Sequence, residues 1–255
     1  MAHTPLTGQA ALVTGGARRI GRGTALALAA AGADIVLTFL ASQSEAEETV
    51  RAVEALGRRA LAIECDVRSE ASVRAAVAAT VARFGRLDLL VNNAAVYEST
   101  PLDRISIDQW DRVFETNARG PFLVAREALP HLRAVRGRIV NIGSLGGLRP
   151  WAGHADYCAS KAALHSLTQS MAKAFAPEVT VNCVAPGWIE MGRMERGRIE
   201  EGNDSESAAA RFAAKTPMRR NGTVDNVAEA VLFFAAGPAF VTGQILAVDG
   251  GLGLL

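Results

Sequence analysis

Short runs of apolar and β-branched residues alternate with segments of helical apolar spacing almost from one end of the chain to the other. The runs are brief and lack polar alternation, which predicts strands buried on both faces. Two intervening segments, 44–56 and 70–84, have helical spacing, and the second begins with acidic residues and ends before Gly85. We expect strands at 9–14, 35–39, 60–65, 87–92, 138–142, 179–185 and 244–248.

Strands that alternate with helices predict an α/β fold, because right-handed crossovers leave few other arrangements. We expect a Rossmann-like, doubly wound parallel sheet of about seven strands between two layers of helices. No shift in composition marks a linker, so residues 1–255 are predicted to be one domain. The charged, glycine-containing stretch 191–220 interrupts the alternation after a strand's carboxyl end, where such sheets bind ligands. It is predicted to be a substrate lid.

Composition excludes several classes of protein. The chain has 255 residues, 49% of them hydrophobic, and a formal net charge of +1, which argues against a nucleic-acid partner. No apolar run approaches the ~18 residues of a membrane span, and no signal peptide is visible. Three cysteines without a CxxC pair suit a reducing compartment. We therefore expect a cytoplasmic protein without a membrane partner.

A glycine-rich turn, 14–23, follows the first predicted strand and precedes a helical run. Such a turn lets backbone amides approach a pyrophosphate, which then lies at the helix N-terminus. Its position in the first βαβ unit predicts a dinucleotide site. The predicted contacts from this turn are Gly15, Arg18, Arg19, Ile20 and Gly21.

The end of the second strand indicates which dinucleotide is bound. A site for NAD would place an acidic residue there to hold the ribose hydroxyls. Residues 38–42, which end at Ser42, contain no acid, so a 2′-phosphate would meet no repulsion. Arg18 can give that phosphate a charged partner. NADP(H) is therefore favoured over NAD(H), with Ser42 at the adenosine end of the site.

Tyr157 and Lys161 are four residues apart in a segment with helical spacing, so their side chains share one helix face. A phenol titrates near 10 in water and exchanges protons poorly at neutral pH unless a nearby cation stabilises the phenolate. Lys161 can supply that cation. Ser144 follows a predicted buried strand, where its hydroxyl could bind a substrate oxygen.

Together these residues resemble the short-chain dehydrogenase/reductase family, and the resemblance covers nearly the whole chain. The family pattern of Ser, twelve residues, Tyr, three residues and Lys falls on Ser144, Tyr157 and Lys161. Its fourth catalytic member, an Asn on the preceding long helix, falls on Asn117. Other family motifs assign cofactor contacts to Asp66, Val67, Asn93, Ala94, Pro186, Gly187 and Ile189, in addition to Tyr157 and Lys161.

The resemblance implies hydride transfer between a nicotinamide and a carbonyl or secondary alcohol carbon. Tyr157 would be general acid in reduction and base in oxidation, and Lys161 would lower its pKa and bind the nicotinamide ribose. Ser144 would polarise the carbonyl, and Asn117 would anchor a water; no metal ion is expected. The family usually forms tetramers, which predicts a homotetramer through helices 118–132 and 155–175 and the segment 252–255.

Departures from the pattern leave the substrate open. Arg19 replaces the middle glycine, as in the glycine loop of pteridine reductases, although that group usually has Asp where this chain has Ser144. A 3-oxoacyl reductase-like enzyme comes first, a pteridine reductase-like enzyme second. A third alternative is a non-catalytic sensor that binds NADP. Such a sensor would be expected to have lost part of the catalytic tetrad, which here is Asn117, Ser144, Tyr157 and Lys161. The predicted substrate contacts are Ser144, Leu145, Trp151, His154, Tyr157 and Trp188.

Overall fold

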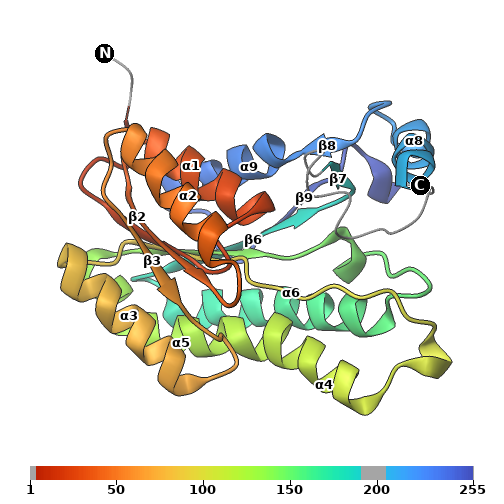
Figure 1. The fold of residues 1–255 in the computed structure, drawn as a ribbon, viewed down its shortest axis with the longest axis horizontal. Helices are drawn as coiled ribbons and strands as arrows, with labels where there is room; N and C mark the ends of the chain where they lie inside the picture. The colour runs from red at the N-terminus through yellow and green to blue at the C-terminus, as the bar shows by residue number, and fades with distance from the viewer. Residues whose placement is uncertain (1–3, 191–204, 255) are drawn as a thin grey trace.

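The computed structural model describes residues 4–190 and 205–254, and its centre is a sheet of seven parallel strands (Figure 1). In spatial order the strands are β3 (Ala60–Glu64), β2 (Asp34–Phe39), β1 (Ala10–Val13), β4 (Leu89–Asn92), β5 (Arg138–Ile142), β6 (Thr180–Pro186) and β9 (Ile245–Val248). The chain runs outwards from β1 to β3, returns to the middle, and runs outwards the other way from β4 to β9. The predicted doubly wound sheet is confirmed. Its direction reverses between β1 and β4, where such sheets form a ligand-binding crevice.

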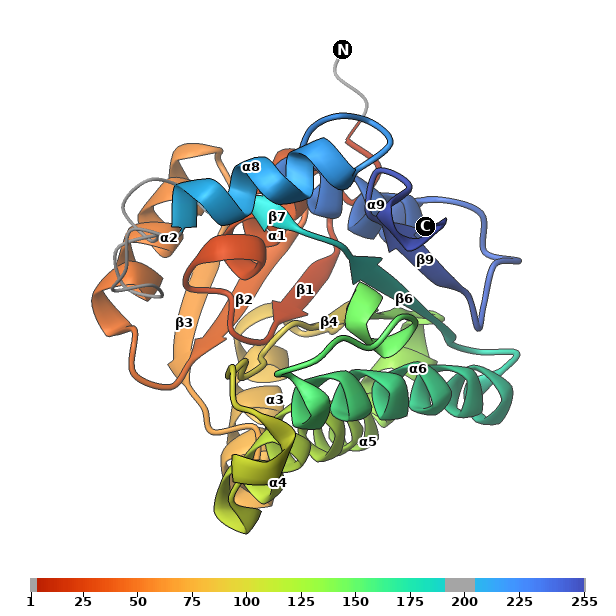
Figure 2. The same cartoon turned by 90° about the vertical axis from the view of Figure 1, so that its right-hand side faces the viewer.

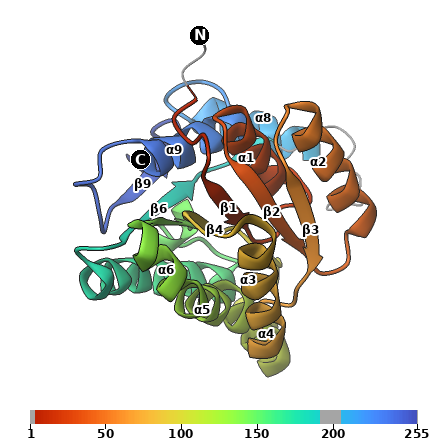
Figure 3. The same cartoon turned by 90° about the vertical axis from the view of Figure 1, so that its left-hand side faces the viewer.

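Helices cover both faces of the sheet, as Figures 1 and 3 show: α1, α2 and α9 on one face, and α3, α5 and α6 on the other. Leu28 and Val231 belong to the apolar cluster of the first face, and Val77 and Leu132 to that of the second. Among the described residues no helix is both long and apolar enough to span a membrane. The helices are α1 (Arg19–Ala30), α2 (Gln43–Ala55), α3 (Glu70–Phe84), α4 (Ile107–Phe114), α5 (Gly120–Val135), α6 (Ala155–Phe175), α8 (Ser205–Lys215) and α9 (Val224–Ala236).

Helix α3 begins and ends where the sequence predicts. The Ser69 side chain accepts a hydrogen bond from the Ser72 amide at 3.3 Å and so caps the first turn. At the other end Gly85 takes a left-handed φ of 75°, the conformation in which glycine ends helices without a Cβ penalty.

The prediction that every strand is buried on both faces is wrong for the two strands at the sheet edges. In β3 only Ala60 is fully buried, and Glu64 is exposed. In β9 the side chain of Leu246 is 39% exposed. An edge strand has a neighbour on one side only, so less of the helical layers covers it.

The stretch 191–220, predicted to interrupt the alternation of strands and helices, contains the eleven-residue helix α8. The chain reaches it through β7 (Ile189–Glu190) and leaves it at β8 (Gly222–Thr223), which pair with each other in parallel. Figure 2 shows α8 on the side of the sheet that α1 and α9 cover. Residues 191–204 of the predicted lid lie outside the described part of the chain.

A buried chain of polar side chains joins the middle of the sheet to α6. Asn92 at the end of β4 donates to Oδ1 of Asn141 on β5 at 2.9 Å, and Asn141 donates to Oγ1 of Thr168 on α6 at 2.8 Å. The exposed fraction of each side chain is at most 3%. Because buried polar groups are costly without partners, these bonds fix α6 against the sheet.

Replacing Thr168 with valine keeps the shape of the side chain but leaves the Asn141 amide without its acceptor. We expect the free energy of unfolding to fall by about 1–3 kcal/mol, the cost of an unsatisfied buried donor. Urea denaturation measures this, with Ser166→Ala at an exposed position of the same helix as the control. A Thr168→Val protein as stable as the control would show that this chain of bonds does not hold the helix.

Candidate functional site

The turn between β1 and α1 is shaped by two residues with positive φ. Gly15 has a φ of 61° and Arg19 a φ of 52°, in the left-handed region that disfavours side chains. Arg19 thus takes the conformation of the glycine that it replaces. At Gly21 a Cβ would lie 2.2 Å from the Gly15 carbonyl oxygen, so this position tolerates only glycine. The close approach keeps the turn against the first turn of α1, as a phosphate site at a helix N-terminus requires.

Asn93, just after β4, holds the glycine turn in place. Its side-chain amide donates to the carbonyl oxygens of Thr14 and Gly15, both at 2.9 Å. The Thr14 hydroxyl in turn accepts from the backbone amides of Asn93 and Ala94 at 3.0 and 3.1 Å. The ends of β1 and β4 are therefore joined on either side of the crevice.

A cleft of about 440 Å³ opens at the carboxyl ends of these strands. Ten of the predicted cofactor residues line it: Gly15, Arg18, Arg19, Ile20, Gly21, Ser42, Asp66, Val67, Asn93 and Ala94. The sequence analysis missed Arg68, Arg112 and Thr116 as lining residues. Thr116 directly precedes Asn117, and Arg112 lies one helical turn before Thr116. Their spacing from Asn117 could therefore have indicated both. The other five residues of the predicted set do not line this cleft: Tyr157, Lys161, Pro186, Gly187 and Ile189.

The adenosine end of the cleft carries no acidic side chain from β2: residues 38–42 line it with Thr38, Phe39, Leu40, Ala41 and Ser42. Arg18 lines it from the glycine turn. Asp66 also lines it, but Arg68 donates to both of its carboxylate oxygens, at 2.7 Å to Oδ2. Hydrogen bonding by Arg68 holds the pKa of Asp66 below its usual value. The lining fits a dinucleotide, and Arg18 adds a positive charge to it.

Ser144, Tyr157 and Lys161 come together at the carboxyl end of β5. Ser144 caps a single 3₁₀ turn (Leu145–Gly147), and its hydroxyl accepts from the Gly146 amide at 3.0 Å. Tyr157 and Lys161 lie one turn apart on α6, and Nζ of Lys161 is 5.8 Å from the centroid of the Tyr157 ring. Nζ donates to the carbonyl oxygen of Ile142, the last residue of β5, at 2.8 Å. The predicted helix face is confirmed.

Burial opposes the charged forms of both groups. It lowers the pKa of Lys161 to about 8 and raises the pKa of Tyr157, and a side-chain hydrogen bond with Ser144 offsets part of the shift at Tyr157. Only 2% of Lys161 is exposed. The Lys161 ammonium therefore loses its proton more readily than it would in water, and the Tyr157 phenol needs a nearby positive charge to ionise at neutral pH.

Asn117 lies in a π-helical turn (Glu115–Arg119) between α4 and α5, not within one regular helix. Its Oδ1 accepts from the Val96 amide at 2.9 Å, and its Nδ2 donates to the Val96 carbonyl at 2.9 Å and to Ser160 Oγ at 3.1 Å. Asn117 is fully buried. The bulge turns its side chain to the loop after β4 and to α6 at once, which spacing alone does not predict.

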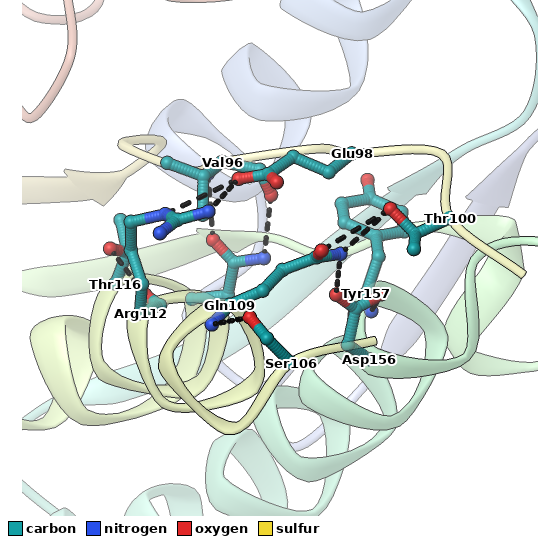
Figure 4. A network of polar contacts seen from close by, with 10 residues as sticks. Val96, Glu98, Thr100, Ser106, Gln109, Arg112, Thr116, Asp156 and Tyr157 are labelled. Carbon is teal, nitrogen blue, oxygen red and sulfur yellow. Dashed lines mark hydrogen bonds and ion pairs between the residues drawn. The ribbon is translucent and has the colours of Figure 1, made fainter. Parts of the chain in front are cut away.

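A second polar network holds the helical turn that carries Tyr157 (Figure 4). Asp156 is fully buried; its Oδ1 accepts from the Tyr157 amide at 2.8 Å and its Oδ2 from Gln109 of α4 at 2.8 Å. Gln109 also exchanges hydrogen bonds with Thr100. The first turn of α6 is thereby tied to α4, which fixes where the phenol lies.

His165, which the sequence analysis did not single out, packs behind Ser144. Its Nε2 is 3.5 Å from the Ser144 amide. A Cβ on Gly143 would lie 2.3 Å from Nε2, and one on Gly147 would lie 2.7 Å from Cε1, so both glycines make room for the ring. Burial and the charge of Lys161 lower the pKa of His165 to about 4, so it is neutral beside the lysine.

The predicted substrate residues divide into three groups. Leu145 and Ser144 are buried beneath the site. Trp188 stacks on Phe212 of α8 with centroids 4.1 Å apart, so it also fastens α8 to the end of β6. His154 and Trp151 lie on the other side, with ring centroids 6.0 Å apart. The sequence analysis missed Tyr97, whose centroid is 4.9 Å from that of Tyr157; the short distance from Asn93 along the loop was the only available signal.

The buried ammonium gives a pH dependence of stability. The folded pKa of Lys161, about 8, lies below the ordinary lysine value of 10.5, so between these values the unfolded chain binds more protons and stability rises with pH. Lys161→Met removes this rise. We therefore compare the free energies of unfolding of Lys161→Met and wild type at each pH. Between pH 7 and pH 10.5 the variant should lose about 3 kcal/mol relative to wild type.

Denaturation at several pH values measures this difference, and Lys173→Met, exposed on the same helix, controls for the change of residue type. The difference in free energy of unfolding between Lys161→Met and wild type could instead stay constant over this pH range. That result would contradict the assignment of a buried cation with a lowered pKa at this position.

Comparisons with known proteins cover almost the whole chain. A family model described as Enoyl-(Acyl carrier protein) reductase matches residues 15–253. The chain is 37% identical over 253 residues to a 3-oxoacyl-(acyl-carrier-protein) reductase from Synechocystis, covering 98% of each protein. It is 36% identical over 256 residues to 3beta-hydroxysteroid dehydrogenase 1 from Eggerthella lenta, covering 99% of this chain and 96% of that protein.

The fold agrees with a solved structure as well. The crystal structure of a dehydrogenase/reductase from Sinorhizobium meliloti 1021 superposes with a TM-score of 0.88 at 37% identity, covering 98% of this chain and 97% of the other. The protein belongs to the short-chain dehydrogenase/reductase family of oxidoreductases, whose members act on CH–OH and C=O groups.

Proposed function

We propose that the protein is an NADPH-dependent reductase of small-molecule ketones that also oxidises the corresponding secondary alcohols. The observation that carries this proposal is the meeting of Ser144, Tyr157 and Lys161 at the end of β5, beside a cleft suited to a dinucleotide. With Asn117 also in place, the tetrad gives no support to a sensor that binds NADP without turnover.

In reduction the Tyr157 hydroxyl donates its proton to the carbonyl oxygen, and Ser144 donates a hydrogen bond to the same oxygen. The dinucleotide, when bound, supplies the hydride that forms the new C–H bond as the C=O π bond breaks, and is itself oxidised. Lys161 stabilises the phenolate that remains until a proton from water replaces the one transferred. Oxidation of the alcohol is the reverse, with Tyr157 as the base.

The proposed preference for NADPH rests on charge. A 2′-phosphate would meet no carboxylate from residues 38–42, and Arg18 lines the same end of the cleft. The only acidic residue that lines the cleft in the described part of the chain, Asp66, is paired with Arg68. These features favour the more negative cofactor.

The names of the relatives span an acyl thioester substrate and a steroid, so they support a ketone or alcohol without fixing its size. The glycine turn with Arg19 keeps a pteridine reductase-like enzyme as the second candidate, although Ser144 stands where that group usually has Asp. We place the substrate beside Tyr157 and propose that the segment 191–220 is its lid.

The protein's three cysteines are free and buried. Free thiols suit a reducing compartment, so we propose that the protein acts in the cytoplasm.

We also propose a homotetramer. Half-exposed or exposed apolar side chains lie on the two surfaces that the family uses for assembly, with Phe122 on α5 and Leu246 on β9 about two-fifths exposed. A hollow of about 380 Å³ beside the N-terminal half of α6 is lined by Trp151, Ala155, Ala159 and Ala162 among others. Small side chains along one helix face let a second helix approach closely.

Tyr157→Phe should keep NADPH binding nearly intact and remove most turnover, because the ring remains and only the proton donor is lost. General acids contribute about 10²–10⁴-fold in rate. A panel of diketones, 3-oxoacyl thioesters, sugars and pterins, followed at the NADPH absorbance, provides the assay. Turnover above half of the wild-type value in Tyr157→Phe would refute the assigned role.

Arg18→Ala should erase most of the preference for NADPH over NADH, which we expect to be roughly ten- to hundredfold from one charge-assisted hydrogen bond. The rate at saturating NADPH should change little, because the 2′-phosphate lies far from the transferred hydride. Phe39→Asp should shift the preference towards NADH by adding a ribose acceptor and a repulsive charge. Comparing kcat/KM for both cofactors tests this; unchanged selectivity in Arg18→Ala would mean that the adenosine end is misassigned.

A further inference from the structure

Tyr97 lies directly beside the phenol that we propose to donate the proton. Its ring meets the Tyr157 ring edge to face, with centroids 4.9 Å apart and planes at 88°. Tyr97 belongs to the loop after β4, in the same turn of chain as Val96, which Asn117 fixes through two hydrogen bonds. Even so, 49% of Tyr97 is exposed. A large ring half exposed next to reacting atoms offers a surface to whatever binds there.

His154 holds the Tyr97 ring in a fixed orientation. The two rings stack with centroids 4.7 Å apart and planes at 19°. His154 Nδ1 lies 2.9 Å from the Glu98 carbonyl oxygen, which can only accept, so Nδ1 carries the proton. His154 Nε2 is then the acceptor for the Tyr97 hydroxyl at 3.1 Å. Stacking and this hydrogen bond leave Tyr97 few conformations to lose when a ligand binds.

The surface around Tyr97 is aromatic and its nearest ion pair is already satisfied. Trp151, 40% exposed, meets His154 edge to face with centroids 6.0 Å apart. Glu98, the next residue after Tyr97, is paired with Arg112 of α4 at 2.7 Å. A ligand beside Tyr157 therefore meets the Tyr97 ring, which the His154 and Trp151 rings support from behind.

We infer that Tyr97, oriented by His154, is a specificity-determining residue that favours ketones carried on a flat ring over open-chain ketones. This inference rests on the proposed ketone reduction and names its substrate class. A flat ring against Tyr97 gains the offset-stacked or edge-to-face contact that aromatic pairs prefer, and an open chain of equal size does not. The contact also holds the ring ketone next to Tyr157, since Tyr97 lies against the Tyr157 ring.

The test compares two substrates in one enzyme: 2-tetralone, whose ketone is part of a fused ring, and ethyl acetoacetate, an open-chain 3-oxo ester. Their ratio of kcat/KM cancels effects common to both, such as cofactor binding or a change in the amount of folded protein. Tyr97→Leu should lower the ratio of 2-tetralone to ethyl acetoacetate about two- to tenfold, the range of one lost aromatic contact. Tyr97→Phe keeps the ring and should lower it less. Phe240→Leu removes a fully exposed ring elsewhere and should leave the ratio unchanged.

A binding measurement separates this inference from the proposed function. Quenching of intrinsic fluorescence gives the Kd of 2-naphthol, a flat ring that undergoes no turnover, in the complex with NADP⁺. Tyr97→Leu should weaken the binding of 2-naphthol by the same two- to tenfold factor. Tyr97→Phe should retain most of the wild-type affinity. If no ketone is reduced, the proposed function fails, and the 2-naphthol series still decides the role of Tyr97.

Three results would overturn the inference while leaving the proposed function intact. One is an unchanged substrate ratio in Tyr97→Leu. Another is a wild-type enzyme that reduces ethyl acetoacetate but no ring ketone. The third is a Kd for 2-naphthol that is the same in wild type and Tyr97→Leu, which would leave Tyr97 a packing residue of the loop.

Discussion

The arrangement of the site depends on one hydrogen bond, from the buried ammonium of Lys161 to the carbonyl oxygen of Ile142 at 2.8 Å. An ammonium that is 2% exposed has lost nearly all its hydration, and burial accordingly lowers its pKa to about 8. Two titratable side chains near it are uncharged at neutral pH. Burial and the lysine charge lower the pKa of His165 to about 4, and burial raises that of Cys183 to about 12. Neither side chain therefore adds a charge beside the ammonium, whose Nζ lies 5.8 Å from the centroid of the Tyr157 ring.

The parallel sheet explains why the remaining groups meet at this point. Because all seven strands run the same way, the glycine turn after β1, Asn93 after β4 and Ser144 after β5 lie at one edge. Hydrogen bonds across the edge then set their distances, as Asn93 does for the glycine turn. Helix α6 brings Tyr157 and Lys161 to the same edge, held against the sheet through Thr168 and against α4 through Asp156. Cleft and proton donor therefore share a rigid support.

Local chemistry made much of this predictable from sequence. The bounds of α3 follow from Ser69 and Gly85, and β5 was predicted at 138–142 because its run of β-branched residues is bounded by polar ones. Ten cleft residues followed from the glycine turn, the end of the second strand and family motifs. The bulged turn around Asn117, the left-handed Arg19 and the stack of Tyr97 on His154 were not predicted, because each depends on contacts between segments distant in sequence. Edge exposure of β3 and β9 likewise depends on strand order, which periodicity does not contain.

The claim at the centre of this account is that the Lys161 charge acts on the Tyr157 phenol, and the chain allows a direct measurement because it contains only two tyrosines. With ¹³C at the tyrosine ring carbon that bears the hydroxyl, an NMR titration of the NADP⁺ complex follows both phenols, and Tyr97→Phe assigns the signal of Tyr157. We expect the pKa of Tyr157 to be at least about one unit lower in wild type than in Lys161→Met, as an opposite charge within ~4–6 Å produces. The same Tyr157 pKa in both proteins would contradict the account.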